Sequence, residues 1–185
     1  MSDSRTHERR FHGEPDRLRS PERIALLEVE RVVALSLERL AAKNALDVGT
    51  GTGVFAEAFT KLGLDVAGID TNTELLKVAR SHVPDARFRE GLAEEIPFED
   101  SSFDLVFLGH VLHETDGPLK ALEEARRIVR KRVVVLEWPY RQEEHGPPLE
   151  HRLRPETIAD MAHEAGFQKV EKIALEHMDL FRLTP

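Results

Sequence analysis

The sequence predicts an α/β fold in which a doubly wound, mostly parallel sheet carries helices on both faces. From residue 43 onward, short apolar runs of strand length alternate with amphipathic runs of helix length, which is the pattern of parallel strands joined by helices. Only the final two strand candidates follow one another without a helix, so we expect the last strand to pair antiparallel. With 185 residues and no cysteine, the chain has the length of one domain without disulfides.

Residues 1–42 precede this alternation and divide into an arm and a helix. Residues 1–23 hold six arginines and few apolar side chains, a composition typical of a frayed terminal arm. From Ser20 to Leu40, apolar residues recur at helical spacing, and Ser20 followed by Pro21 is a typical helix start. The spacing predicts one helix that begins at Pro21.

Predicted strands and helices alternate along the rest of the chain. Seven apolar runs are predicted as strands, at 45–48, 66–69, 86–89, 103–108, 132–137, 170–176 and 179–183. Four amphipathic segments are predicted as helices, at 54–62, 73–82, 118–129 and 155–165.

Charge and hydropathy argue against several classes of protein. The 34 acidic and 26 basic side chains give a net charge of −8, which opposes tight binding to the phosphate backbone of a nucleic acid. The longest apolar runs are far shorter than the ~20 residues that a bilayer crossing needs. The first ten residues are too polar for a secretion signal. We therefore expect a cytoplasmic protein that does not insert into a membrane.

A glycine-rich loop follows the first predicted strand and leads into a helix. Its glycines are Gly49, Gly51 and Gly53, and glycine is needed where a ligand approaches the backbone closely. A dinucleotide fingerprint would place its third glycine at position 54, which is Val54, and no Walker loop is present. Asp70 closes the second strand about 20 residues later, where a carboxylate accepts hydrogen bonds from ribose hydroxyls. The pattern predicts an adenosine-containing cofactor; the alternative is a tight turn that binds nothing.

A third landmark covers residues 88–98, FREGLAEEIPF, and is followed by DSSFDLV at 100–106. Together with the glycine loop and Asp70, it resembles the class I S-adenosylmethionine-dependent methyltransferases. The resemblance is strongest to the small-molecule branch, methyltransferase type 11, which includes the ubiquinone and menaquinone biosynthesis enzymes, and it is close over residues 43–137. It implies a Rossmann-like, seven-stranded sheet whose last strand is antiparallel, with S-adenosyl-L-methionine as cofactor and S-adenosyl-L-homocysteine as product.

The resemblance also implies which residues bind the cofactor. Asp47 and the glycine loop would hold its methionine end, Asp70 its ribose, and Ala93 with Glu94 would flank its adenine. The full set is Asp47, Gly49, Thr50, Gly51, Gly53, Asp70, Thr71, Leu92, Ala93, Glu94, Gly109 and His110. Leu92 departs from the family, which has a small polar or acidic residue there, so an adenine hydrogen bond from this position is not expected. Residues 1–42, including Phe11 and His12, would cover the site that residues 43–185 form.

The catalytic candidates follow the fourth predicted strand. A methyl group on a sulfonium is already activated for in-line displacement, so the protein mainly aligns the reactants and excludes water. A base is needed only when the acceptor must lose a proton. His110 would contact the cofactor or acceptor, and His113 or Glu114 would be the base; alternatively, the two histidines are packing or capping residues.

A stiff loop follows the fifth predicted strand. Glu137 and Trp138, followed by GPPLE at 146–150, are similar to a bacterial subgroup of the family, and the two prolines fix the path of the loop over the strand ends. Residues of this loop would shape the acceptor pocket or be ordinary loop residues; they are Tyr140, His145, His151 and Arg152.

Other functions have less support in the sequence. The histidines lack the spacing of a metal site, so no metal is expected. Residues 108–111 lack the motif of methyltransferases that act on nucleic-acid amino groups. A basic cluster is better explained by helix-end and local ion pairing; its members are Arg126, Arg127, Arg130, Lys131 and Arg132. We expect a monomer or homodimer that methylates a small organic acceptor. The alternatives are a silent cofactor-binding module, a methyltransferase acting on RNA or protein, and a dinucleotide-dependent oxidoreductase.

Overall fold

A seven-stranded sheet forms the centre of the computed structural model, which describes residues 15–185. The strand order is β3-β2-β1-β4-β5-β7-β6, and β7 lies antiparallel between β5 and β6 while β1 to β5 are parallel. The predicted sheet, with its antiparallel last strand, is confirmed. The strands are β1 (Asn44–Val48), β2 (Asp65–Asp70), β3 (Arg87–Glu90), β4 (Phe103–Gly109), β5 (Val129–Glu137), β6 (Lys169–Ala174) and β7 (Asp179–Thr184).

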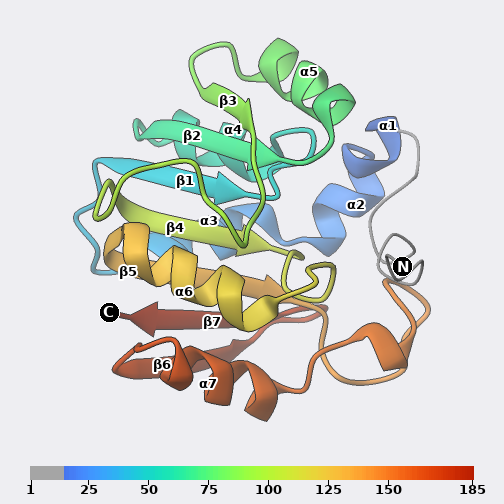
Figure 1. The fold of residues 1–185 in the computed structure, drawn as a ribbon. Coiled ribbons are helices and arrows are strands. Elements are labelled where there is room, and N and C mark those ends of the chain that lie inside the picture. Colours follow the sequence, from blue (N-terminus) through green and yellow to red (C-terminus); the bar gives the residue numbers. More distant parts are fainter. Residues whose placement is uncertain (1–14) are drawn as a thin grey trace, which may run out of the picture.

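Helices cover both faces of the sheet (Figure 1). One face packs against α6 and α7, and the other packs against α3 and α4. The short α1 and α2 lie beside the carboxyl ends of the parallel strands. The helices are α1 (Pro15–Leu18), α2 (Pro21–Leu26), α3 (Val29–Leu37), α4 (Val54–Lys61), α5 (Thr73–His82), α6 (Pro118–Ile128) and α7 (Pro155–Glu164), with a 3₁₀ turn η2 (Leu149–His151).

The central strands are apolar throughout because they are buried on both faces. In β4, Val106 and Leu108 belong to the core layer under α6 and α7, whereas Leu105 and Phe107 belong to the layer under α3 and α4. This alternation is the period of two that a strand imposes on its side chains. The continuous apolar runs of the sequence are therefore buried parallel strands, whose carboxyl ends meet at one edge.

The prediction of a single helix from Pro21 is wrong, because the structure has two helices there, α2 and α3. Its start is confirmed, because the Ser20 hydroxyl accepts a hydrogen bond from the Arg23 backbone N–H at 3.2 Å. It breaks at Glu28, whose φ of 46° is left-handed, and α3 begins again at Val29. The Glu28 carboxylate contacts Arg31 and the backbone N–H of Glu176. Apolar spacing cannot reveal one left-handed residue held by such a distant partner.

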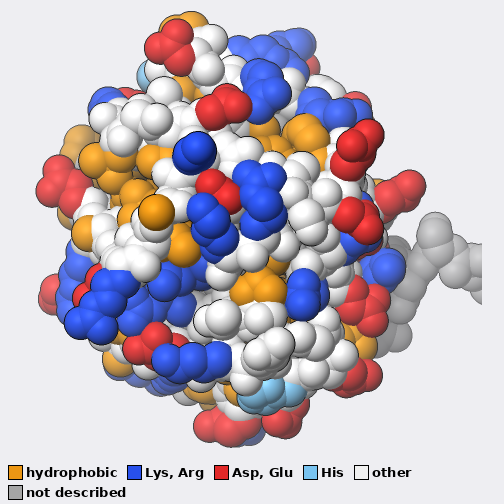
Figure 2. All heavy atoms as spheres, turned by 90° about the vertical axis from the view of Figure 1, so that its left-hand side faces the viewer, with side chains coloured by type: hydrophobic (Ala, Val, Ile, Leu, Met, Phe, Trp, Pro, Cys, Tyr) orange, Lys and Arg blue, Asp and Glu red, His pale blue; other side chains and the backbone are white. Residues whose placement is uncertain are grey.

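The basic cluster lies near the amino ends of the parallel strands, on the face of the molecule shown in Figure 2. Arg127 pairs with Glu124 and Asp100, both at 2.8 Å, and Arg130 pairs with Asp104 at 2.8 Å. Lys131 and Arg132 donate to backbone carbonyls of the segment after α3 and of its last turn. These cations therefore bind the chain itself, but of the contacts named here only the Arg127–Glu124 pair is the local pairing that the sequence predicted.

Candidate cofactor and acceptor site

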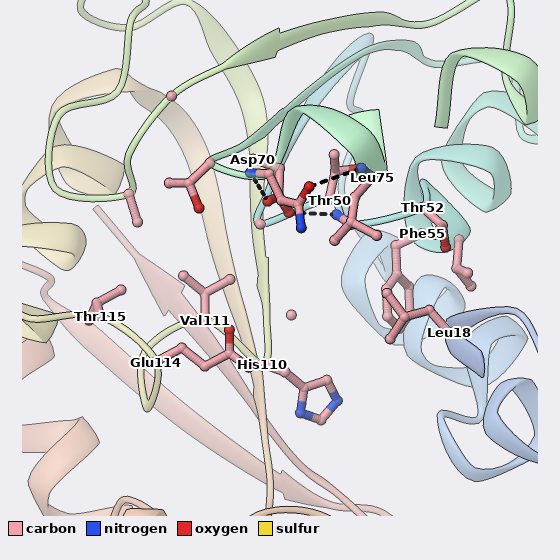
Figure 3. Close-up of a pocket in the computed structure, with 18 of the residues that line it drawn as sticks. Leu18, Thr50, Thr52, Phe55, Asp70, Leu75, His110, Val111, Glu114 and Thr115 are labelled. Carbon is pink, nitrogen blue, oxygen red and sulfur yellow. Dashed lines mark hydrogen bonds between the residues drawn. The ribbon is translucent and has the colours of Figure 1, made fainter. Parts of the chain in front are cut away.

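A pocket of about 480 Å³ opens at the carboxyl edge of the sheet. It lies where β1 separates β2 from β4, the place where open α/β sheets bind ligands, and its volume suits a small molecule. Figure 3 shows its two sides: Thr50 and Asp70 lie across the pocket from His110 and Glu114.

The glycine loop forms one wall by close packing against the segment after β4. Gly49 has a φ of 67°, and a Cβ there would lie 2.3 Å from the Cγ2 of Val111. Gly51 has a φ of 54°, and among the described residues a Cβ there would meet only Leu18 within 4 Å. Gly53 does not line the pocket; it packs against Ala79 of α5. Two of the three glycines thus face the ligand space, and the third serves helix packing.

Gly49→Ala is expected to weaken binding of S-adenosylhomocysteine at least about 10-fold, because the new methyl group displaces Val111 and strains a left-handed backbone. Isothermal titration of the variant measures this. Gly63→Ala is the matched control: Gly63 also has a positive φ, 85°, but it is not in the pocket wall, and a Cβ there would meet no other atom of residues 15–185 within 4 Å. Equal losses in both variants would contradict the steric explanation.

Asp47 lies beneath the glycine loop and not in the pocket wall. Its carboxylate accepts hydrogen bonds from the Thr50 hydroxyl at 2.7 Å and from the Ala56 backbone N–H at 3.2 Å. Burial raises the pKa of the Asp47 carboxyl to about 7, against the effect of these two hydrogen bonds. Asp47 therefore holds the loop in place from behind, which is a different position from the ligand contact that the resemblance implied.

Asp70 ties the loop to the end of β2. One carboxylate oxygen accepts a hydrogen bond from the Gly51 N–H at 2.8 Å, and the other accepts one from the Asn72 N–H at 2.8 Å. Both Asp70 and Thr71 line the pocket. A carboxylate in this place has the geometry expected for a ribose-binding residue.

The third landmark supplies the next wall through Leu92, Ala93 and Glu94. Leu92 is 42% exposed, so its side chain offers an apolar surface where the family has a polar one. The Glu94 carboxylate accepts hydrogen bonds from the backbone N–H groups of Asp116 and Gly117 at the start of α6. Glu94 thereby links this wall to the segment after β4.

His110 lies at the end of β4, with Gly109, on the opposite wall. Its φ of 60° is left-handed, and both ring nitrogens are buried without a hydrogen-bond partner among the described residues. Burial lowers the pKa of His110 well below its usual value, and the charges of Arg23 and His113 lower it further, so the ring is neutral at pH 7. The Thr52 hydroxyl, which sequence reasoning missed, is buried on the pocket and has no partner in this part of the chain either. Buried polar atoms of this kind fit a polar ligand.

His113 is buried behind the wall rather than in it. Its Nδ1 lies 2.7 Å from the Glu137 carboxylate, and its Nε2 lies 3.8 Å from the carboxylate of Glu114, which lines the pocket. Burial lowers the pKa of His113, but the charge and hydrogen bond of Glu137 outweigh it, so the net pKa is raised. Sequence reasoning did not connect Glu137 to His113, because 24 residues separate them.

The N-terminal segment contributes Leu18, Arg23 and Leu27 to the pocket. It is attached by Arg19, which donates to the Thr52 carbonyl at 2.7 Å and pairs with Glu57 of α4. These three side chains border the pocket, and the covering role of residues 1–42 stays a prediction. Phe11 and His12 lie outside the described residues.

The loop after β5 is organised by Arg152 and does not reach the pocket wall. The buried Arg152 guanidinium donates to four carbonyls of the loop, those of Pro139, Arg141, His145 and Pro147. A Cβ on Gly146, whose φ is 86°, would lie 2.6 Å from the Trp138 ring. Tyr140 stacks under Arg154 instead of facing the pocket. The loop therefore fixes Trp138, and the four loop residues predicted as acceptor contacts lie away from the pocket.

No group of three or more potential metal-binding side chains occurs in the described part of the chain, residues 15–185. None of its helices is long and apolar enough to cross a membrane.

Comparisons with known proteins find similar methyltransferases. Residues 46–136 match a family model described as a methyltransferase domain. A demethylmenaquinone methyltransferase of Renibacterium salmoninarum is 35% identical over 112 residues, which are 60% of this chain and 47% of the relative. An uncharacterized methyltransferase of Mycobacterium tuberculosis is 39% identical over 90 residues, 49% of this chain and 37% of the relative. The chain thus spans less than half the length of these curated relatives.

Solved structures share the fold. A SAM-dependent methyltransferase from Aquifex aeolicus superposes with a TM-score of 0.79, covering 92% of this chain and 98% of that one at 23% identity. The cofactor of such proteins, S-adenosylmethionine, fits a pocket bordered by two glycines, a carboxylate at the end of β2 and polar atoms that lack partners among the described residues. The match over residues 46–136 and the shared fold together support a class I S-adenosylmethionine-dependent methyltransferase.

Proposed function

We propose that the chain methylates a small organic acceptor with S-adenosylmethionine as the methyl donor. The observation that carries the proposal is the pocket itself: the glycine loop, Asp70 and the polar segment after β4 all border one space. Its 480 Å³ lies within the range of pockets that enclose small molecules. A relative named demethylmenaquinone methyltransferase supports a small-molecule acceptor.

The chain's own residues bind and orient. When bound, S-adenosylmethionine supplies a methyl group that the sulfonium has already activated. Asp70 would hold the ribose hydroxyls, and Leu92 with Ala93 would pack against the adenine. The backbone at Gly49 and Gly51 would hold the amino-acid end. Leu18 and Leu27 border the pocket from α1 and from the end of α2, where they would help to exclude water from the reacting groups.

A proton acceptor is available for acceptors that must lose a proton. His110 fits this role best, because it is neutral and its ring nitrogens have no partner within the described chain. Glu114 is the second candidate, since it also lines the pocket. His113 acts through Glu114 as a positioning residue, because it lies behind the wall and is held by Glu137.

The proposal is tested by incubating the purified protein with S-adenosylmethionine and a panel of phenols, carboxylic acids, amines and a reduced naphthoquinone. Mass spectrometry measures S-adenosylhomocysteine and the methylated product. We expect acceptor-dependent turnover and binding of S-adenosylhomocysteine but not NAD in titrations. Binding of the cofactor without turnover on any acceptor would instead indicate a silent binding module, and binding of NAD would indicate an oxidoreductase.

A further inference from the structure

Arg23 lines the pocket from α2. Its Nε is buried without a partner, and none of the hydrogen bonds and ion pairs within residues 15–185 involves the guanidinium. Burial lowers the pKa of Arg23, while the charge of Glu114 raises it. A buried N–H donor without an acceptor is costly for a folded protein, so the Nε of Arg23 indicates a ligand that provides the acceptor.

His110 and Arg23 are held next to each other by one aromatic platform. The His110 ring lies 5.0 Å from the Trp138 ring, and the Arg23 guanidinium lies over the same ring at 5.2 Å. Trp138 is buried and is fixed by Gly146 and by Arg152, which lies over it at 5.5 Å. The loop after β5 therefore sets the position of both donors without entering the pocket.

The two side chains offer complementary hydrogen-bonding groups. Arg23 is a planar cation that matches a carboxylate, and a neutral imidazole offers one N–H donor and one acceptor nitrogen. His110 lies on the wall opposite Asp70, where the ribose is expected, as Figure 3 shows. Arg23 lies on the same side, because its guanidinium and the His110 ring both lie against Trp138. This side of the pocket is left for the acceptor.

We propose that Arg23 and His110 bind a carboxylate of the methyl acceptor, which makes the acceptor a small organic acid. Arg23 provides the charged donors and His110 its single N–H, which leaves the other ring nitrogen for a protic group of the same molecule. The assignment rests on the proposed function, because it takes the rest of the pocket as the cofactor site. The cofactor also has a carboxylate, and the experiment distinguishes binding of the acceptor carboxylate from binding of the cofactor carboxylate.

The test uses the full chain saturated with S-adenosylhomocysteine. Ligand-observed NMR measures binding of benzoate and salicylate, and each acid is compared with its primary amide. We expect the acids to bind the wild type more tightly than the amides, and Arg23→Gln to weaken the acids at least about 10-fold while leaving the amides unchanged. Arg23→Lys keeps the charge but loses the planar, bidentate donor geometry of the guanidinium. Its affinity for the acids should therefore lie between those of the wild type and Arg23→Gln. Arg17→Gln is the matched control, since Arg17 is exposed and outside the pocket wall.

A second titration compares S-adenosylhomocysteine with methylthioadenosine, which lacks the amino-acid carboxylate. We expect Arg23→Gln to leave both affinities unchanged. If it weakens only S-adenosylhomocysteine, Arg23 binds the cofactor and the acceptor assignment is wrong. Equal binding of acids and amides, or no binding of any acid, would also overturn it. A wild-type chain that binds no S-adenosylhomocysteine would refute the proposed function before any acid is added.

Discussion

Glu137→Ala is expected to lower the free energy of unfolding by about 3–5 kcal/mol at pH 6, the typical loss when one member of a buried ion pair is removed. Glu137 is 1% exposed, and its carboxylate lies 2.7 Å from His113. Without it, His113 must either stay charged in a buried place or give up its proton. Urea unfolding followed by circular dichroism measures the change.

The loss of unfolding free energy in Glu137→Ala should decrease as the pH rises. The folded-state pKa of His113 is raised above the unfolded value, so its contribution is fully present below about pH 6.5 and is lost as pH rises through the folded pKa. The difference between wild type and Glu137→Ala should therefore be larger at pH 6 than at pH 9. Glu137→Gln, which keeps an acceptor oxygen, should recover part of the lost unfolding free energy.

Glu171→Ala serves as the control for this prediction. Glu171 pairs with Arg182 at 2.9 Å, but its side chain is 41% exposed. Exposed pairs contribute about 0–1 kcal/mol, so the control should change stability little at either pH. A loss in Glu137→Ala that is small, or that does not vary between pH 6 and pH 9, would contradict the buried charged pair.

Asp70→Ala is expected to weaken binding of S-adenosylhomocysteine by more than about 100-fold. In the proposed cofactor position, the variant would remove a charged acceptor for two ribose hydroxyls, and each such hydrogen bond contributes about 1.5–3 kcal/mol. It also removes the acceptor of the Gly51 and Asn72 backbone N–H groups, which loosens the glycine loop. Isothermal titration of the purified variant measures the affinity.

Asp65→Ala is the matched control for Asp70. Asp65 lies at the opposite end of the same strand, where it pairs with Arg87 at 2.9 Å, and both side chains are exposed. We expect the control to bind S-adenosylhomocysteine like the wild type. An Asp70→Ala variant with unchanged affinity would show that the ribose does not lie at the end of β2, and the cofactor assignment would then fail.

The sequence was sufficient for the features that depend on neighbours in the chain. Strands such as β4 are visible because a buried parallel strand needs an unbroken apolar run. Gly49, Gly51 and Asp70 are visible because a loop that approaches a nucleoside needs glycine and a following carboxylate at fixed spacing. Each of these signals lies within a few residues of the element that it defines.

Contacts between distant segments were decided only by the tertiary structure. Glu28 breaks the N-terminal helix, and its partner Glu176 lies 148 residues away. Trp138 contacts both His110 and Arg23, although Arg23 and Trp138 belong to different halves of the chain. Local spacing carries no information about which buried polar group meets which, because that depends on how the elements pack. The sequence alone therefore determined the fold and the glycine loop, and folding decided which side chains form the proposed acceptor side of the pocket.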